Sequence, residues 1–154
     1  GGTLPDSSLI SRKLAPMEFK LCASKAYLEK WGRPQNPAEL SAHKQIRYRL
    51  PGTGQIPEWQ LSNAGETYTV PSRPVLVFNN QDACRDAITA GLGIGFLEAA
   101  HYSVPVQQGV IEILLEGYRL LRDSAYHLYY PHREHLAPKV RVFVDFLIEQ
   151  FARG

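Results

Sequence analysis

Residues 75–98 read VLVFNNQDACRDAITAGLGIGFLE and contain three segments with different patterns. The first segment, residues 75–78, is entirely apolar, which is typical of a parallel strand that is covered on both faces. Behind Asn79 and Asn80, either of which can cap a helix, apolar and small residues recur at the spacing of one helical face. The glycines that follow end this helix and let it lie close to a sheet, before a second apolar segment at residues 94–98. The stretch therefore predicts a strand–helix–strand unit and an α/β fold.

Two places in the sequence have side chains suited to ligand binding. In open α/β sheets ligands bind outside the carboxyl ends of strands, so the turn at residues 79–82 is the first place. The second is a predicted strand at residues 45–50, where two arginines share one face and a glycine-rich loop with exposed backbone amides follows. The candidate residues are Arg47, Arg49, Thr53, Gln55, Trp59, Asn79 and Asn80. Together they suit a small anionic or polar ligand. The alternative is that the arginines face solvent and the tryptophan belongs to the core.

The composition is that of an ordinary globular protein with one domain or two small lobes: 154 residues, 44% hydrophobic and 21% charged. The net charge is +2, and the two signs are interspersed, unlike the charge of a nucleic-acid-binding surface. No apolar run approaches the roughly 20 residues that span a bilayer, and the N-terminus lacks the pattern of a signal peptide. We therefore expect a cytoplasmic protein without a membrane partner.

The sequence shows no motif of a catalytic, metal or cofactor site. A nucleophile elbow, a P-loop and a dinucleotide fingerprint are absent, so we expect neither an enzyme nor a bound cofactor. His132 and His135, with His127 upstream, flank a proline turn without helical geometry and are expected to be solvated loop residues, not metal ligands. Cys22 and Cys84 are far apart and are expected to be free buried thiols. The alternative for Cys84, in the first turn of the predicted helix, is a lowered pKa and sensitivity to oxidants.

Hydrophobic periodicity predicts the remaining elements. The predicted strands cover residues 18–23, 45–50, 59–62, 67–70, 110–115 and 125–130. The predicted helices cover residues 25–30, 38–42 and 138–153. Ser24 and Asn36 are placed to cap the first two helices. The last helix has a broad apolar face, which must pack against a sizeable surface.

Several segments resemble, in their order and spacing, the C-terminal part of LysR-type transcriptional regulators. They are DSSLISRKLAP at 6–16, FKLCASKAYLEKWGRPQNPAELSAH at 19–43, WQL at 59–61, FNNQDACRDAITAGLGIGFLE at 78–98 and YYPHREHLAPKVRVFVDFL at 129–147. The resemblance implies an α/β fold of the type II periplasmic-binding-protein kind, in which two crossover strands join two lobes around an inducer. It implies that residues 1–20 are the end of lobe I and the first crossover. Residues 21–124 would form a complete lobe II, and residues 125–154 the second crossover strand and the C-terminal helix of lobe I.

The resemblance also implies a function and a site. The expected function is that of the effector-binding regulatory domain of a bacterial transcription factor, which senses a small, anionic inducer without catalysis. Such a protein forms a homo-oligomer, a dimer or a tetramer, and binds DNA through an N-terminal domain that is absent from this chain. The family's inducer contacts fall on the end of the strand at residues 47–50 and on the loop at residues 51–55, which adds Pro51 and Gly52 to the candidates. The alternative is a periplasmic-type solute-binding protein that serves a transporter.

Overall fold

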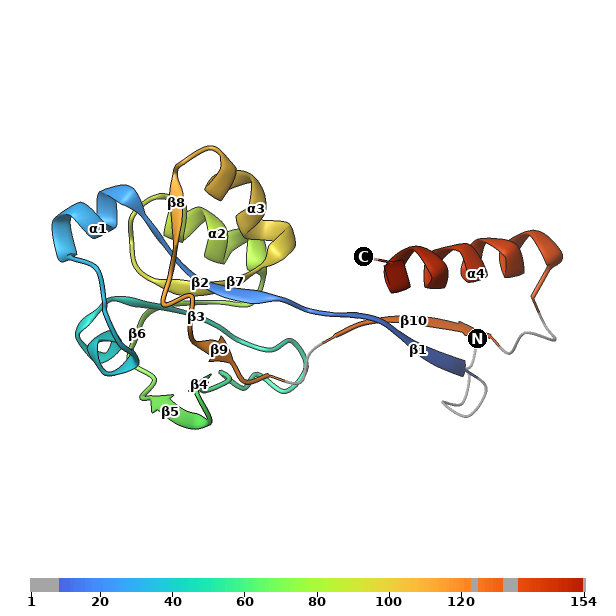
Figure 1. The fold of residues 1–154 in the computed structure, drawn as a ribbon, viewed down its shortest axis with the longest axis horizontal. Coiled ribbons are helices and arrows are strands. Elements are labelled where there is room, and N and C mark those ends of the chain that lie inside the picture. The colour runs from blue at the N-terminus through green and yellow to red at the C-terminus, as the bar shows by residue number, and fades with distance from the viewer. Residues whose placement is uncertain (1–8, 123–124, 132–135, 154) are drawn as a thin grey trace. The chain divides into compact units, whose positions relative to one another are not determined.

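The computed structural model in Figure 1 describes residues 9–122, 125–131 and 136–153. The chain forms two compact units, one from the described parts of residues 1–17 and 123–154, and the other from Glu18–Arg122. The elements in chain order are β1 (Leu9–Pro16), β2 (Phe19–Ser24), α1 (Lys25–Trp31), the 3₁₀ helix η2 (Pro37–Ala42), β3 (Gln45–Tyr48), β4 (Trp59–Asn63), β5 (Glu66–Val70), β6 (Pro74–Phe78), α2 (Gln81–Thr89), β7 (Gly95–Glu98), α3 (Ala99–Gln107), β8 (Ile111–Leu114), β9 (Arg119–Leu120), β10 (Ala125–Pro131) and α4 (Pro138–Arg153). No helix within the described ranges is long and apolar enough to cross a membrane.

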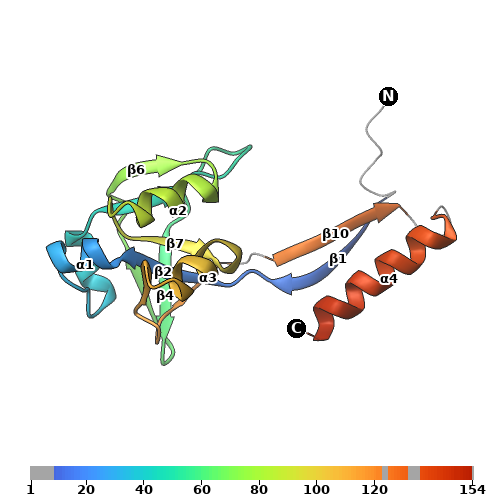
Figure 2. The same ribbon diagram turned by 90° about the horizontal axis from the view of Figure 1, so that it is seen from above.

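A mixed sheet lies at the centre of the unit Glu18–Arg122. Strands β7, β2 and β8 form an antiparallel set, and β3 pairs with β6 in parallel. The two sets join where Ile46 N donates to Ile94 O and Ile94 N donates to Lys44 O, both at 2.8 Å. The strand order is therefore β6-β3-β7-β2-β8, and α2 connects β6 to β7 (Figure 2). The predicted strand–helix–strand unit and the α/β fold are confirmed.

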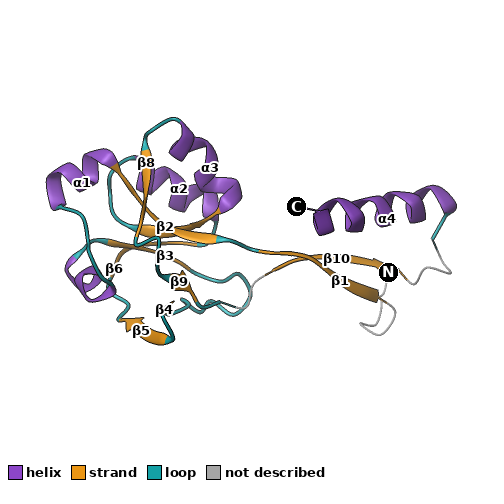
Figure 3. Ribbon diagram, viewed as in Figure 1, coloured by secondary structure: helices purple, strands orange, loops and turns teal. Residues whose placement is uncertain are grey.

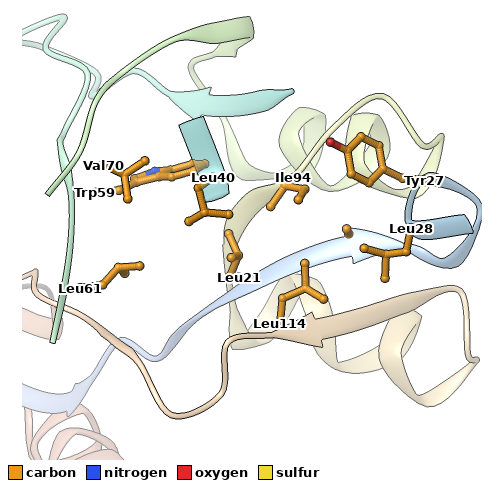
Figure 4. Packing of buried hydrophobic residues seen from close by; sticks show 10 residues of the cluster. Leu21, Tyr27, Leu28, Leu40, Trp59, Leu61, Val70, Ile94 and Leu114 are labelled. Atoms are coloured by element: carbon orange, nitrogen blue, oxygen red, sulfur yellow. The ribbon is translucent and has the colours of Figure 1, made fainter. Parts of the chain in front are cut away.

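The two faces of this sheet carry separate cores, because successive residues of a strand point to opposite sides. Figure 3 shows α2 and α3 on one side of β2 and β3, with β4 and β5 on the other. The core under α2 and α3 consists of Cys22, Ile46, Cys84, Ala87, Ile88, Leu97, Tyr102 and Ile111. The core on the other face consists of Leu21, Ala23, Tyr27, Leu28, Leu40, Trp59, Leu61, Val70, Ile94 and Leu114. Figure 4 shows this second cluster, in which Trp59 and Val70 lie next to each other beside Leu40.

Two glycines after α2 allow β3 and β7 to approach closely. A Cβ atom on Gly93 would lie 2.4 Å from Lys44 O, and one on Gly95 would lie 2.8 Å from Ile46 O. Real Cβ atoms essentially never come this close to a backbone oxygen, so both positions require glycine. The sequence predicted glycines for close packing of the helix on the sheet. The closest backbone contact is instead between neighbouring strands.

The other unit consists of two paired strands that are far apart in the sequence and one helix. Strands β1 and β10 are antiparallel, from Leu9 opposite Pro131 to Pro16 opposite Ala125, with an irregularity after Lys13. Helix α4 packs against β1 (Figure 1). In α4, Val144 is 5% exposed, whereas Val140, Val142, Phe143, Phe146 and Phe151 are exposed. The described residues thus leave uncovered much of the apolar face for which the sequence predicted a packing partner.

Three local predictions differ from the structure. Strand β6 pairs with β3 alone among the described residues, so it is an edge strand, and Val75 is 50% exposed instead of covered on both faces. Strand β3 ends at Tyr48, two residues earlier than predicted. Helix α1 extends one residue further than predicted, to Trp31, whose side chain is 47% exposed and has the Lys44 Nζ atom 4.6 Å from its ring centroid.

Candidate functional site

The carboxyl ends of β3 and β6 lie side by side. Tyr48 pairs with Phe78 in parallel register, and Arg49 N donates to Phe78 O at 2.7 Å. The loop after β3 therefore begins next to Asn79 and Asn80, which follow β6. Asn80 caps α2, because its Oδ1 atom accepts a backbone N–H of the first turn at 2.8 Å. The structure brings Arg49 and the two asparagines to the same edge of the sheet, where the helix N-terminus also lies.

The loop at residues 50–55 is closed by its own hydrogen bonds. Leu50 N donates to Gln55 O at 2.8 Å, and Gly54 N donates to Leu50 O at 3.0 Å. Arg49 Nη1 donates to Gly54 O at 2.8 Å and so folds back on the loop. The exposed candidate residues here are Arg49, Pro51, Gly52, Thr53 and Gln55. Since several of its amides bond within the loop, the loop is not the open anion cradle that its glycine content predicted.

Arg47 lies in the interior and is only 1% exposed. Its Nε and Nη2 atoms donate to Gln45 Oε1 at 3.0 and 2.8 Å. Its guanidinium group also donates to backbone carbonyl oxygens of Pro57, Val70 and Pro71. The ring centroid of Trp59, itself 6% exposed, lies 3.7 Å from Arg47 Cζ. Burial lowers the pKa of Arg47 to about 10, while the nearby carboxylate of Glu58 opposes this effect.

These contacts separate the two arginines that the sequence placed on one strand face. Arg47 is buried in β3, whereas Arg49 follows the end of β3 and is exposed. Trp59 is a core residue, as the alternative interpretation held, but the same interpretation was wrong in placing Arg47 in solvent. A ligand would reach the Arg47 guanidinium only by replacing its hydrogen bonds to Gln45 and to the backbone.

A small cavity lies beside the edge formed by β3 and α2. Its lining residues are Ile46, Tyr48, Pro57, Glu58, Trp59, Gln81, Phe96, Leu120 and Arg122. Its volume is about 20 Å³, which is room for about one or two water-sized groups. Of the candidate residues from the sequence, the lining includes Trp59 alone. All the lining residues belong to the unit Glu18–Arg122, so the cavity is a property of that unit by itself.

Two polar side chains of the cavity, Gln81 and Arg122, have groups that form no hydrogen bond with a described residue. Gln81 Oε1 is buried and accepts no hydrogen bond from any described residue. Arg122 forms no ion pair or hydrogen bond with a described residue, and its Cζ atom lies 5.0 Å from the centroid of the Phe19 ring and 5.7 Å from that of Tyr48. Burial lowers the pKa of Arg122, and the Tyr48 hydroxyl opposes this effect.

Sequence reasoning missed the polar lining of this cavity. Gln81 lies within the turn at residues 79–82 that the rule on strand ends indicated, although it was not among the named candidates. Tyr48 lies next to the candidate Arg49 but was placed inside the predicted strand at residues 45–50. Arg122 carried no such signal, because it follows β9, a two-residue strand that was not predicted.

The two cysteines are buried thiols with raised pKa values. Cys22 and Cys84 are free and buried, as predicted. Burial raises the pKa of Cys84 to about 11 and that of Cys22 to about 12. The alternative that Cys84 has a lowered pKa is therefore wrong, because desolvation dominates over any effect of the helix N-terminus. The predicted loop histidines His132 and His135 lie outside the described residues, as does the side chain of His127.

The fold agrees with the comparisons to known proteins. The sequence matches the family model of the LysR substrate binding domain over residues 1–152. The chain therefore belongs to this family, whose fold is of the type II periplasmic-binding-protein kind, and whose members matched here are transcriptional regulators and not enzymes.

Named relatives support the same assignment. The chain is 30% identical over 149 residues to an HTH-type transcriptional regulator of Xanthomonas campestris pv. campestris (strain 8004), covering 96% of this chain and 43% of that protein. It is 32% identical over 150 residues to the HTH-type transcriptional activator AaeR of Escherichia coli (strain K12), covering 97% and 48%. The chain spans about half the length of the curated relatives it matches.

Solved structures give the same result. The full-length structure of the Vibrio cholerae virulence activator AphB, a member of the LTTR family, has 29% identity and a TM-score of 0.78, over 96% of this chain and 49% of that one. The regulatory domain of CrgA, a LysR-type transcriptional regulator from Neisseria meningitidis, has 27% identity and a TM-score of 0.77, over 97% and 72%.

Proposed function

We propose that this chain is the effector-binding part of a LysR-type transcriptional regulator, which senses a small molecule and passes the signal to a DNA-binding domain. The observation that carries the proposal is the family match over residues 1–152. A ligand that binds one conformation more tightly shifts the population of conformations, and this shift changes the activity of the attached domain. DNA binding belongs, in this proposal, to a part of the regulator outside these residues.

The proposed ligand site is the edge of the unit Glu18–Arg122 that carries the small cavity. Three features support this choice: it lies at the carboxyl ends of the parallel strands β3 and β6, the N-terminus of α2 opens on it, and the buried Gln81 Oε1 atom there has no partner among the described residues. The exposed candidates Arg49, Pro51, Gly52, Thr53, Gln55, Asn79 and Asn80 lie on the loops of this edge. We propose these as outer contacts, and Arg47 as a residue that holds Trp59 and Pro57 in the cavity wall.

We further propose that residues 21–124 are lobe II of a two-lobed effector domain. Residues 1–20 and 125–154 would then supply the crossover strands and the last helix of lobe I. The support is that both hydrophobic cores lie between Leu21 and Leu114, inside the compact unit Glu18–Arg122. The uncovered apolar side chains of α4, among them Phe143 and Phe146, would pack against the rest of lobe I in the complete regulator.

The experiment that tests the function uses the complete gene product. In a gel-shift assay at physiological salt we expect the complete protein to bind its own promoter region and the 154-residue chain not to bind it. Failure of the complete protein to bind any DNA near its gene would contradict the regulator. A signal peptide in place of a helix-turn-helix pattern in the complete sequence would instead favour the solute-binding alternative.

A further inference from the structure

Arg122 differs from the other buried arginine of the same unit. The N–H groups of Arg47 donate hydrogen bonds to Gln45 and to backbone carbonyl groups, as is usual for a guanidinium group with a structural role. Arg122 is half-buried, yet none of its donors bonds to a described residue. The rings of Phe19 and Tyr48 hold its position by cation–π contact, which leaves the N–H groups free. A partly desolvated cation with unused donors is suited to an anion.

Gln81 supplies a second, independent polar contact in the same cavity. Its Oε1 atom is buried and unpartnered, and a buried carbonyl oxygen is normally satisfied by a donor. Gln81 and Arg122 both line the cavity, together with apolar side chains from Ile46, Trp59, Phe96 and Leu120. The cavity of about 20 Å³ is partly open and has room for the carboxylate oxygens, so the rest of the ligand would lie outside it, over the rim.

We propose that Arg122 binds the carboxylate of the effector, and that Gln81 Oε1 accepts a hydrogen bond from an O–H or N–H group next to that carboxylate. The effector class is therefore a small hydroxy- or amino-carboxylate with an apolar body. Glu58, the one carboxylate in the lining, disfavours ligands with a second negative charge. This inference rests on the proposed function, because it assumes that the cavity is the effector site.

The test uses four probes of one shape with the 154-residue chain in isothermal titration calorimetry. L-phenyllactate and L-phenylalanine carry both groups, 3-phenylpropionate lacks the donor, and L-phenylalaninol lacks the carboxylate. We expect phenyllactate or phenylalanine to bind about ten-fold or more tightly than either single-function probe, because the missing group leaves a polar partner unsatisfied. The stronger of the two tells whether the donor is a hydroxyl or an ammonium group.

Variants assign the contacts. Arg122→Met should lower the affinity of the chain for the carboxylate probes about ten-fold or more. Arg122→Lys should bind these probes more tightly than Arg122→Met does, because lysine keeps the positive charge. Gln81→Leu should lower the affinity for phenyllactate or phenylalanine but leave the affinity for 3-phenylpropionate unchanged. Arg73→Met, which removes an exposed arginine outside both the cavity lining and the proposed outer contacts, is the matched control and should bind all probes as the unaltered chain does.

Several outcomes overturn the inference. Unchanged binding in Arg122→Met, equal binding of 3-phenylpropionate and phenyllactate, or no binding of any carboxylate probe would each contradict the ligand class. The melting temperature of each variant, measured alongside, shows whether a loss of binding comes from unfolding. If Arg122→Met is unfolded, Arg122→Lys is the deciding variant. The gel shift of the complete protein is independent of these results, so a regulator with a different ligand class is distinguished from a protein that is not a regulator.

Discussion

Arg47 carries a positive charge in the interior, and among the described residues no carboxylate lies within ion-pair distance of it. Gln45 makes this possible, because its Oε1 atom accepts from Arg47 and from Arg73 N while its Nε2 atom donates to Leu40 O and Pro71 O. The network ties β3 to η2 and to the chain after β5. Removing the guanidinium would take one donor each from Pro57 O, Val70 O and Pro71 O and two from Gln45 Oε1, which costs more than the loss of an exposed hydrogen bond.

We therefore predict that Arg47→Met lowers the free energy of unfolding by about 3 kcal/mol. The measurement is urea denaturation followed by circular dichroism. Arg49→Met removes an arginine of the same loop region that is exposed, and it should change stability by less than about 0.5 kcal/mol. Equal effects of the two substitutions would show that the Arg47 network does not stabilise the fold.

The buried thiols predict how stability changes at alkaline pH. In the unfolded chain Cys22 and Cys84 ionise near their ordinary pKa of 9.0, whereas in the folded chain their pKa values are raised to about 12 and about 11. Above pH 9 the folded state therefore binds more protons than the unfolded state, and stability falls as pH rises, by about 1 kcal/mol per pH unit for each thiol. Urea titrations between pH 8 and 11 should show a shallower slope for the variant with both cysteines replaced by alanine. An equal slope in both proteins would contradict the raised pKa values.

At the scale of residues, the sequence predicted two loops that share an edge of the sheet, and the assignment of this edge as the effector site is our proposal. The Asn79–Asn80 turn was predicted from the rule on strand ends, and the loop after β3 from its glycines and the neighbouring arginines. Both lie at one edge of the sheet. Arg47 was misjudged because alternation along a strand tells which residues share a face but not which face is covered. Arg122 was missed because its approach to Tyr48 is a long-range contact that no local pattern contains.

The junction between β3 and β7 is the element on which the continuity of the sheet depends. Its two hydrogen bonds join Ile46 and Ile94 to the opposite backbone, and Gly93 makes room for Lys44 O. We predict that Gly93→Ala lowers stability by about 2 kcal/mol or more, because the new methyl group overlaps a backbone oxygen. In thermal unfolding this corresponds to a melting temperature lower by about 4–8 °C.

Gly117→Ala is the matched control for this substitution. The Cβ atom at position 117 would have Asn63 Nδ2 at 3.8 Å as its nearest neighbour, which is an ordinary contact. We expect this variant to melt within about 2 °C of the unaltered chain. If Gly93→Ala were equally harmless, β3 and β7 would be able to separate without cost, and the sheet would not be continuous as described.

Strand β6 is an exposed edge of the central sheet and a suitable surface for the homo-oligomer that the family resemblance implies. An unpaired edge strand offers a row of backbone groups to a second copy, and Val75 adds a half-exposed apolar side chain. We predict that Val75→Lys lowers the mass of the chain in size-exclusion chromatography with light scattering. Val104→Lys, at an exposed valine of α3, should leave the mass unchanged. An oligomer that tolerates Val75→Lys would have to use another surface.

Local patterns predicted most elements, and the failures have common causes. The strands β2 to β8 and β10 were predicted, as were the helices α1, η2, α2 and α4. Strand β1 was not, because residues 9–16 lack strict alternation and β10, its partner, lies more than a hundred residues away in the sequence. The two-residue β9 is defined by its pairing with β4 and not by any periodicity of its own. Strands of this kind are fixed by tertiary pairing, which the sequence does not display.

At the scale of the whole molecule, the two compact units differ in how much hydrophobic core each of them contains. Both hydrophobic clusters lie in the unit Glu18–Arg122, where each face of the sheet is covered by elements of the same unit. In the described part of the other unit, α4 keeps several phenylalanine side chains exposed. A domain that contains its own hydrophobic core can fold by itself, whereas a unit with an uncovered apolar face needs additional residues to cover that face.

We therefore predict that a fragment of residues 18–122 folds alone, with a single cooperative transition in urea monitored by circular dichroism and by the fluorescence of the buried Trp59. A shorter fragment of residues 18–109 is the control. It lacks β8, and with it Ile111 of one core and Leu114 of the other, so both faces of the sheet lose a buried side chain and β2 loses a neighbour. We expect the shorter fragment to unfold without a cooperative transition. If the fragment 18–122 also failed to unfold cooperatively, its sheet would depend on the β1–β10 pair, and the proposed division into a complete lobe II and part of lobe I would be wrong.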